Sequence, residues 1–360
     1  MIKYTLGIIK NNDNPTYTDW RDLACKCGLN ASMTPEWINT SFAALATKPQ
    51  VLEVFASLNE GLVTGLIPFY YTKTRMHGLP IKLIGLAGNY ASYHQEIISL
   101  NQHSEILNAL LLKKQEWQVF QAENVPNNGP TANALRSIAK TYGHTLLEYP
   151  GDASPYIEVN HHSFEEYLST KTKKFRYNRK KEVKDFHKKG LSENKWYTEE
   201  SSIDELLRLI FQIEEKSWKI NEDMSITQNT NEIELYKHLI PTLAYNKTLL
   251  ANVLFLNGSP IAYNLCYFWN NRIGQIKTSF NDEFKHLSPG SVVLFHLLEK
   301  AFELQAKEFD FLGDIMPHKM KWTNTTRQQT SFYMYSKKHI TSSIIGKIKQ
   351  LRHTRKQSHR

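Results

Sequence analysis

The stretch Leu249–Phe280, LLANVLFLNGSPIAYNLCYFWNNRIGQIKTSF, decides the fold of this 360-residue chain. Two short turn signals, Asn257-Gly258 and Asn270-Asn271, divide it into three runs that are rich in β-branched and aromatic residues. Asn-Gly suits a type I′ hairpin turn, whose two central residues both need a positive φ. The pattern therefore predicts three consecutive antiparallel strands, at 249–256, 261–269 and 273–280.

The segment after this meander predicts a loop, a helix and a last strand. A polar loop at 281–289 leads into a helix from Gly290 to about Ala306, and a strand follows at Phe309–Gly313. The start of a helix presents unpaired N–H groups and a partial positive charge, which together suit a phosphate group. Gly290 permits close approach of the backbone. On these grounds alone, Ser288, Pro289, Gly290 and Ser291 suit either a pyrophosphate site or an ordinary helix start, and the local sequence leaves both open.

Polar residues around the last strand are the candidates for chemistry. The strand carries Asp310 and is followed by Asp314, at a sheet edge where α/β folds bind ligands. His318 titrates near neutral pH and Lys319 is able to hold a phosphate or an oxyanion. Upstream, Glu215 ends a predicted helix and is a candidate base on an amine, with Ser217 and Trp218 beside it.

The first half of the chain repeats the order of the second in weaker form. Val51–Tyr71, VLEVFASLNEGLVTGLIPFYY, again reads as strand, turn and strand, with helices and strands in matching order around it. We therefore predict an α/β (α+β) fold of two related halves, each a mainly antiparallel mixed sheet flanked by helices. The expected domains are 1–150 and 151–335, with Gly151–Pro155 as linker and a basic tail at 336–360.

The positive charge is local. The net charge is +9, yet 171–189 holds ten Lys/Arg against two acidic residues, and 337–360 holds eight Lys/Arg and no acidic residue. Two local cationic segments argue against a broad DNA-binding surface and for contacts with phosphates or an acidic membrane. No run approaches the roughly 18 apolar residues that cross a bilayer, and no signal peptide is evident, so we expect a cytoplasmic protein.

Four sequence blocks, in order, carry a resemblance to a known family. These are Ser163–Phe186 (SFEEYLSTKTKKFRYNRKKEVKDF), Glu215–Lys219 (EKSWK), His286–Ser291 (HLSPGS) and the DFLGD…HKMKW block over Asp310–Trp322. With TPEW, GLIPFYY and GLAGNYASYHQ in the first half, they are similar to the bacterial GNAT-related acetyltransferases of the CelD type, from about Thr34 to Trp322. In that family a Tyr usually precedes the Lys of the last motif, whereas here the residue is His318.

The resemblance implies tandem GNAT-like domains, distantly related to the FemABX aminoacyltransferases, with an active second half and a degenerate first. It implies acetyl-CoA as donor, with its pyrophosphate at Ser288–Ser291, and Glu215, Ser217, Trp218, Asp314 and Lys319 on the acceptor side. The expected reaction is N-acylation of an amino sugar or another amine in envelope or exopolysaccharide synthesis.

Three further expectations concern ligands and partners. We expect no metal, because Cys25 and Cys27 have no second pair to complete a zinc site. The tail at 340–360 has isoleucines at roughly helical spacing among basic residues and suits either a peripheral membrane contact or a frayed end. A FemABX-like transfer from aminoacyl-tRNA and a non-catalytic binding module remain the alternative functions.

Overall fold

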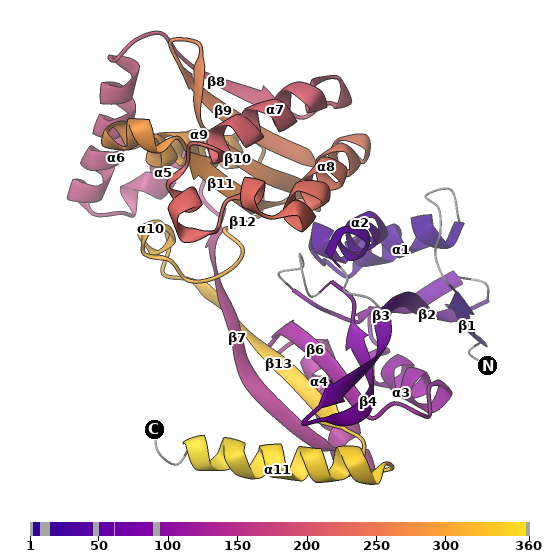
Figure 1. Ribbon diagram of the computed structural model, residues 1–360. Helices are drawn as coiled ribbons and strands as arrows, with labels where there is room; N and C mark the ends of the chain where they lie inside the picture. Colours follow the sequence, from indigo (N-terminus) through magenta and orange to yellow (C-terminus); the bar gives the residue numbers. More distant parts are fainter. Residues whose placement is uncertain (1–2, 8–14, 46–49, 61, 89–93, 358–360) are drawn as a thin grey trace. The chain divides into compact units, whose positions relative to one another are not determined.

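The computed structural model describes residues 3–7, 15–45, 50–60, 62–88 and 94–357 (Figure 1). The chain forms two compact units, one of residues 1–154 together with 327–360 and one of residues 155–326. Among the described residues, no helix has both the length and the apolar character that crossing a membrane requires.

The first unit is a mixed sheet in the order β1-β2-β3-β4-β6-β13-β7, covered by helices. Its strands are β1 (Lys3–Gly7), β2 (Val51–Asn59), β3 (Leu62–Met76), β4 (Leu79–Leu86), β5 (Ile98–Ser99, paired with β3), β6 (Val119–Pro126), β7 (Thr145–Glu158) and β13 (Thr326–Tyr335). Its helices are α1 (Pro15–Lys26), α2 (Pro35–Leu45), α3 (His103–Lys113), α4 (Pro130–Tyr142) and α11 (Ile340–Gln357).

Alternation along β2 explains why both faces of this sheet are covered. Val54 and Ala56 point to one face and pack in a cluster with residues of α1 and α2, including Trp20. Phe55 points to the other face and packs with residues of α3 and α4, including Leu107. Successive side chains of a strand lie on opposite faces, so an unbroken apolar run here builds two cores.

The second unit is a sheet in the order β7-β12-β11-β10-β9-β8, to which β7 contributes Tyr156–Glu158. Its strands are β8 (Ser192–Tyr197), β9 (Leu249–Leu256), β10 (Ser259–Trp269), β11 (Arg272–Phe280) and β12 (Glu308–Asp310). Its helices are α5 (Phe164–Ser169), α6 (Lys173–His187), α7 (Ile203–Glu214), α8 (Thr230–Tyr245), α9 (Pro289–Glu303) and α10 (Pro317–Met320). The predicted meander is confirmed, and Asn257 and Gly258 have φ values of 51° and 77°, as the hairpin turn requires.

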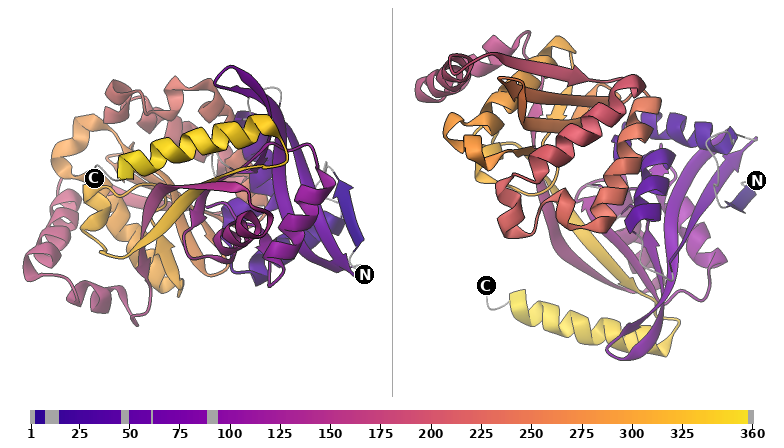
Figure 2. Two further views of the ribbon diagram at one scale, coloured as in Figure 1. Left: turned by 90° about the horizontal axis from the view of Figure 1, so that it is seen from below. Right: turned by 45° about the horizontal axis from the view of Figure 1, so that its top comes forward.

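Neighbouring residues of β10 show which helices cover which face of the second sheet. Tyr263 hydrogen-bonds to Glu214 of α7, whereas Asn264 hydrogen-bonds to the Val293 carbonyl of α9. Both layers are visible in the two views of Figure 2, in which helices lie on either side of the strands.

The two units share one topology, which confirms the predicted fold class. In each, an antiparallel meander ends on a strand with a parallel neighbour, β4 beside β6 and β11 beside β12. In each, a glycine of the last meander strand pairs with a tyrosine whose ring covers it, Gly85 with Tyr70 and Gly274 with Tyr267. A Cβ atom at either glycine would lie 2.3 Å from the tyrosine Cζ atom, so neither position accepts a side chain without movement of the ring.

Several predicted boundaries need correction. The block Ser163–Phe186 contains two helices, α5 and α6, because Thr172 caps the second by accepting from the Phe175 N–H group. The helix that was expected to end at Glu215 ends at Glu214, and the strand predicted at Phe309–Gly313 ends at Asp310. Gly151–Pro155, predicted as a linker, lies within β7. The residues after 336 contain the helix α11, which belongs to the first unit.

Candidate active site

The site begins where two parallel strands separate. β12 pairs with β11 only from Arg272 to Gly274, opposite Glu308 to Asp310, whereas β11 continues to Phe280. Immediately beyond the last pair, β11 has one residue more than β10: Gln275 pairs with Cys266 and Lys277 with Leu265, which leaves Ile276 as a β-bulge. Bulges re-aim the backbone and are frequent beside active sites. In the first unit the β3–β4 register is continuous from Phe69 to Met76.

The loop after β11 places the start of α9 where β11 and β12 separate. Ser288 adopts a left-handed conformation, with φ of 54°, and its side chain does not cap the helix. Pro289 occupies the first turn and has no N–H group to satisfy. Gly290 allows α9 to approach β11 closely, because a Cβ atom there would lie 3.2 Å from the Phe280 ring. The result is a helix start without a side-chain cap.

A cavity of about 460 Å³ lies at this point. Its lining comes from α6, β11, the start of α9 and the segment around α10, and includes Arg179, Glu182, Trp218, Gln275, Thr278, Ser279, Phe280, Lys285, Ser288, Pro289, Gly290, Ser291, Leu294, His318, Lys321 and Trp322. A neighbouring groove of about 620 Å³ shares Glu182 and Ser288 with it and is lined further by Lys181, Lys188, Lys189 and His286.

A charged cluster from α6 lies at the start of α9. Arg179 donates to the Ser291 hydroxyl oxygen (2.5 Å) and to Glu182 (2.7 Å), and the Ser291 hydroxyl donates to Glu182 (2.6 Å). The Arg179 guanidinium lies 5.4 Å from the centre of the Phe175 ring, and its Nε atom is buried without a hydrogen-bond partner in the described part of the chain. An arginine whose Nε–H group has no partner in the described part of the chain suits an anionic ligand, and so does a helix start that no side chain caps.

A row of buried amides holds Gln275 in the cavity wall. The Val293 carbonyl can only accept hydrogen bonds, so the Nδ2 groups of Asn252 and Asn264 face it, at 3.2 and 3.1 Å. The Oδ1 atom of Asn264 therefore remains to accept from Gln275 Nε2 at 2.8 Å. Because the Gln275 Nε2 group donates to Asn264, its Oε1 atom remains as the hydrogen-bond acceptor at the cavity end of this row.

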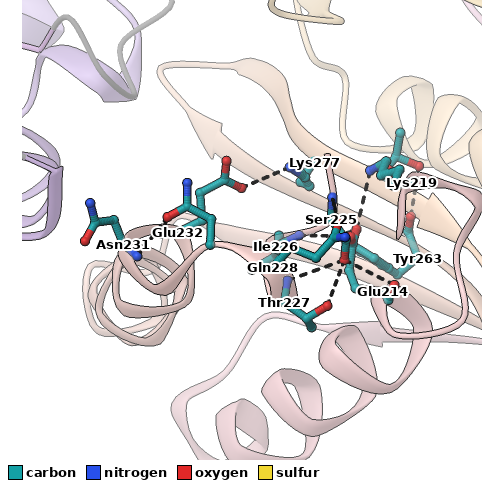
Figure 3. Close-up of polar contacts among 12 residues, drawn as sticks. Glu214, Lys219, Ser225, Ile226, Thr227, Gln228, Asn231, Glu232, Tyr263 and Lys277 are labelled. Atoms are coloured by element: carbon teal, nitrogen blue, oxygen red, sulfur yellow. Dashed lines mark hydrogen bonds and ion pairs between the residues drawn. The ribbon is translucent and has the colours of Figure 1, made fainter. Parts of the chain in front are cut away.

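A second buried polar cluster supports β11 from the opposite face (Figure 3). The fully buried Glu214 carboxylate accepts from the Tyr263 hydroxyl at 2.6 Å, the Ile226 N–H at 3.2 Å and the Lys219 ammonium at 3.4 Å. Lys219 also donates to the carbonyl of the cavity residue Thr278, at 2.5 Å. Burial lowers the pKa of Lys219 to about 8, against the opposing effect of Glu214. The cluster fixes the free end of β11.

His318 is a titratable side chain of the cavity wall. Partial removal from water, followed by the positive charges of Lys319, Lys321 and Lys219, lowers the pKa of His318 below its ordinary value. An imidazole with a lowered pKa is neutral at pH 7 and is able to accept a proton.

Asp310 and Lys319 hold the loop that follows β12. Asp310 accepts from the Leu312 N–H group at 2.8 Å, and Lys319 donates to the carbonyls of Leu312 (2.5 Å) and Asp314 (3.1 Å). Burial lowers the pKa of Lys319, whereas Asp310 and Asp314 oppose this shift. Both side chains thus contact the backbone of the loop.

The structure brings together only some of the residues predicted from the sequence. Ser288, Pro289, Gly290, Ser291, Trp218 and His318 line the cavity. Glu215 is exposed at the end of α7, Asp314 is exposed, and Ser217, Asp310 and Lys319 are buried outside the lining. Sequence reasoning assigned the basic segment 171–189 to phosphate contacts without singling out Arg179, and it missed Glu182, Gln275 and the pair Glu214–Tyr263. The sequence did contain a signal for the pair Glu214–Tyr263 and for Gln275. Tyr263 and Asn264 place polar groups in the otherwise apolar strand β10, and buried polar groups need hydrogen-bond partners.

No three His, Cys, Asp or Glu side chains of the described residues come together to form a possible metal site.

Part of the chain that lines this cavity matches a known family model. Residues 173–320 match the family model described as "Acetyltransferase (GNAT) domain". No curated protein matches the sequence.

Solved structures share the fold over most of the chain. FemX has 12% sequence identity and a TM-score of 0.61, over 92% of this chain and 97% of FemX. A protein of unknown function from Bacteroides thetaiotaomicron has 11% identity and a TM-score of 0.59, over 93% of this chain and all (100%) of the other. L-PGS from Bacillus licheniformis has 10% identity and a TM-score of 0.53, over 95% and 98% of the two chains. At these identities the likeness establishes the fold alone.

Proposed function

We propose that this chain, whose residues 173–320 carry a GNAT acyltransferase domain, transfers an acyl group from acyl-CoA to an amine, with acetyl-CoA as the favoured donor. The observation that carries the proposal is the uncapped start of α9, which lines a cavity where β11 and β12 separate. The proposed acceptor is an amino sugar or another amine of envelope or exopolysaccharide synthesis, the process to which CelD-type enzymes are linked, and the proposed location is the cytoplasm.

The start of α9 supports an assignment for the donor. In the proposal, the diphosphate of CoA lies against Ser288, Pro289, Gly290 and Ser291, where N–H groups and the helix dipole favour negative charge. Arg179 adds a charge-assisted contact, for which its buried Nε atom has no other partner in the described part of the chain. A bound diphosphate would repel the Glu182 carboxylate. In the proposal, Arg179 therefore gives up its ion pair with Glu182 and binds the diphosphate when acetyl-CoA is present.

The proposed chemistry is a direct transfer with donor and acceptor bound together. The neutral amine attacks the thioester carbonyl, the new C–N bond forms and the C–S bond breaks. His318 removes the proton from the amine and passes it to the departing CoA sulfur, which leaves as the thiol. N–H groups of the bulged stretch 275–277 polarise the carbonyl, and correct positioning supplies much of the rate. The lowered pKa of His318 supports its role as the base.

The acceptor side includes Trp218 in this proposal, and Gln275 Oε1 as an acceptor for an N–H group. Glu215, Asp314 and Lys319 remain predicted catalytic residues, and Ser217 and Asp310 predicted acceptor-binding residues. Substitution of Glu215 and of His318 separates the two candidate bases. If His318 is the base, His318→Gln lowers kcat by about 10²- to 10⁴-fold, whereas Glu215→Gln changes it little. The reverse result assigns the base to Glu215.

The test of the function is a search for bound donor. Mass spectrometry of the purified protein is expected to detect CoA species, and calorimetry with acetyl-CoA is expected to show one site per chain. Absence of binding at millimolar acetyl-CoA contradicts the proposal and favours the non-catalytic module.

The alternative function is aminoacyl transfer from tRNA, as in FemABX enzymes. The likeness to the fold of FemX and the ten basic residues between 171 and 189 favour it. In this case aminoacyl-tRNA supports acyl transfer in the absence of CoA. Its affinity then falls steeply with salt, because RNA binding by basic residues releases counterions.

A further inference from the structure

The C-terminal helix α11 (Ile340–Gln357) has one face that is covered within its own unit and an opposite, apolar face that is exposed. At 3.6 residues per turn, its residues fall into an inner and an outer set on opposite sides of the helix. Figure 2 shows α11 lying across strands of the first unit.

The inner face is fixed by specific contacts. Ile345 is 3% exposed and packs in the cluster that contains Leu147 and Tyr335. Gly346 allows close contact, because a Cβ atom there would lie 2.8 Å from that of Tyr335 and 3.1 Å from that of Thr145. The Ser342 hydroxyl donates to the Ser336 carbonyl at 2.6 Å. These contacts settle the rotation of α11 about its axis.

The outer face carries four large apolar side chains in one stripe. Ile340, Ile344, Ile348 and Leu351 are 80%, 51%, 43% and 63% exposed. Their positions fall within about 80° of the helix circumference, at 100° per residue. Single exposed apolar residues are ordinary on protein surfaces, whereas four on one side of a helix form a continuous apolar surface.

The charge around this stripe is of one sign. The segment 337–360 contains eight Lys/Arg and no Asp or Glu. Lys347 and Arg352 are exposed and flank the stripe on either side of the helix. An apolar stripe between cations matches the interface of an anionic bilayer, where acyl chains meet negative headgroups. A surface of acidic residues without an apolar layer would leave the stripe in water.

We propose that the outer face of α11 binds the surface of a membrane that contains anionic lipids. The stripe Ile340–Ile344–Ile348–Leu351 enters the boundary between headgroups and acyl chains, and the flanking basic residues contact the headgroups. The helix lies parallel to the surface and anchors the chain from outside the bilayer. This inference rests on α11 alone and holds whichever acyl donor the second unit uses.

The test is co-flotation of the full chain with vesicles of phosphatidylcholine containing 30% phosphatidylglycerol, against vesicles of phosphatidylcholine alone. We expect binding to the anionic vesicles, at least tenfold weaker binding to the neutral ones, and release by 500 mM NaCl. Ile344→Ser/Leu351→Ser is expected to weaken binding at least tenfold. Removal of the whole helix is a poorer test, because it also removes the buried Ile345.

Leu100→Ser/Leu112→Ser is the matched control, since both leucines are exposed in the first unit outside α11 (62% and 46%). We expect this variant to bind as the unchanged protein does, with both variants keeping the same melting temperature. Equal binding by the α11 variant, or no binding of the unchanged chain to anionic vesicles, overturns the proposal. Sedimentation that shows a dimer of the unchanged chain and a monomer of Ile344→Ser/Leu351→Ser assigns the stripe to a second copy instead.

Discussion

His318 shows how the charge around one side chain sets a pH dependence. Its pKa is lowered by partial burial and by three lysines, so the neutral imidazole required of a base is present at pH 7. We expect kcat/KM to be constant at neutral pH and to fall as the pH drops through this lowered pKa, where the ring becomes charged. Lys321→Gln removes one positive charge and therefore raises the pKa of His318, which moves the acidic limb to higher pH. Lys307→Gln, an exposed change that does not act on His318, is expected to leave the profile unchanged.

Tyr263 provides a test of the buried cluster on the other face of the sheet. Tyr263→Phe removes a donor from the fully buried Glu214 carboxylate. Loss of a partner to a buried charged group costs about 1–3 kcal/mol, so the free energy of unfolding is expected to fall by this amount in urea denaturation. Tyr245→Phe, at an exposed residue of α8, is the control and is expected to change the free energy of unfolding by less than about 0.5 kcal/mol. An equal effect of the two changes would show that the Glu214 contact does not stabilise the fold.

At the scale of the secondary-structure element, the start of α9 is the part of the site that most directly tests donor binding. Gly290→Asp introduces a carboxylate near the proposed diphosphate, and at about 5 Å the repulsion is of the order of 3 kcal/mol. We expect affinity for acetyl-CoA, measured by calorimetry, to fall about 100-fold. Gly290→Ala adds only a methyl group beside Phe280, and we expect a much smaller loss. If alanine weakens binding as much as aspartate does, the effect is steric and the electrostatic assignment fails.

The elements that the sequence predicted well are those with strong local signals. The β9–β11 meander has two turn signals at its hairpins, and α9 has Ser-Pro-Gly at its start. The segments missed include β1 and α1, near the N-terminus, the strands β7 and β8, and β13, which carries the polar residues Arg327, Gln328 and Gln329 at its start. β13 becomes a strand through pairing with β6, some 200 residues away in the chain, and no local pattern records this.

The sequence predicted the helix start that lines the cavity, yet it did not predict which residues lie beside it. The sequence motif pointed to Glu215 as the candidate base, whereas Glu214 is the buried residue of the two. The position of a residue in a motif does not show which of two adjacent glutamates faces the core. Arg179 and Gln275 belong to the cavity through contacts between α6, β11 and α9 that depend on tertiary packing. Asp310 and Lys319 looked like ligand-binding groups, but their polar atoms contact the backbone of the loop after β12.

At the scale of the whole molecule, the two units have the same strand order but differ at the position of the site. The bulge at Ile276 in β11 has no counterpart in the β4 pairing from Leu79 to Leu86. We therefore expect only the second unit to bind the donor. In hydrogen exchange followed by mass spectrometry, acetyl-CoA should protect peptides covering 275–294 and leave those covering 79–86 and 103–113 unchanged. Equal protection in both units would contradict the assignment of one donor site.

The order of the chain has a consequence for synthesis on the ribosome. The second unit, 155–326, is continuous, whereas the first is completed only by β13 and α11 at the end of the chain. Growing polypeptides acquire structure as their segments emerge. The sheet that contains β4 and β6 is therefore incomplete, with one edge of β6 unpaired, until β13 has been translated. The second unit, although translated later, is the first to have all its strands. A nascent chain that stops at residue 326 would expose this edge of β6. An early stop of translation would therefore leave the N-terminal half incomplete, and a chaperone would bind that half first.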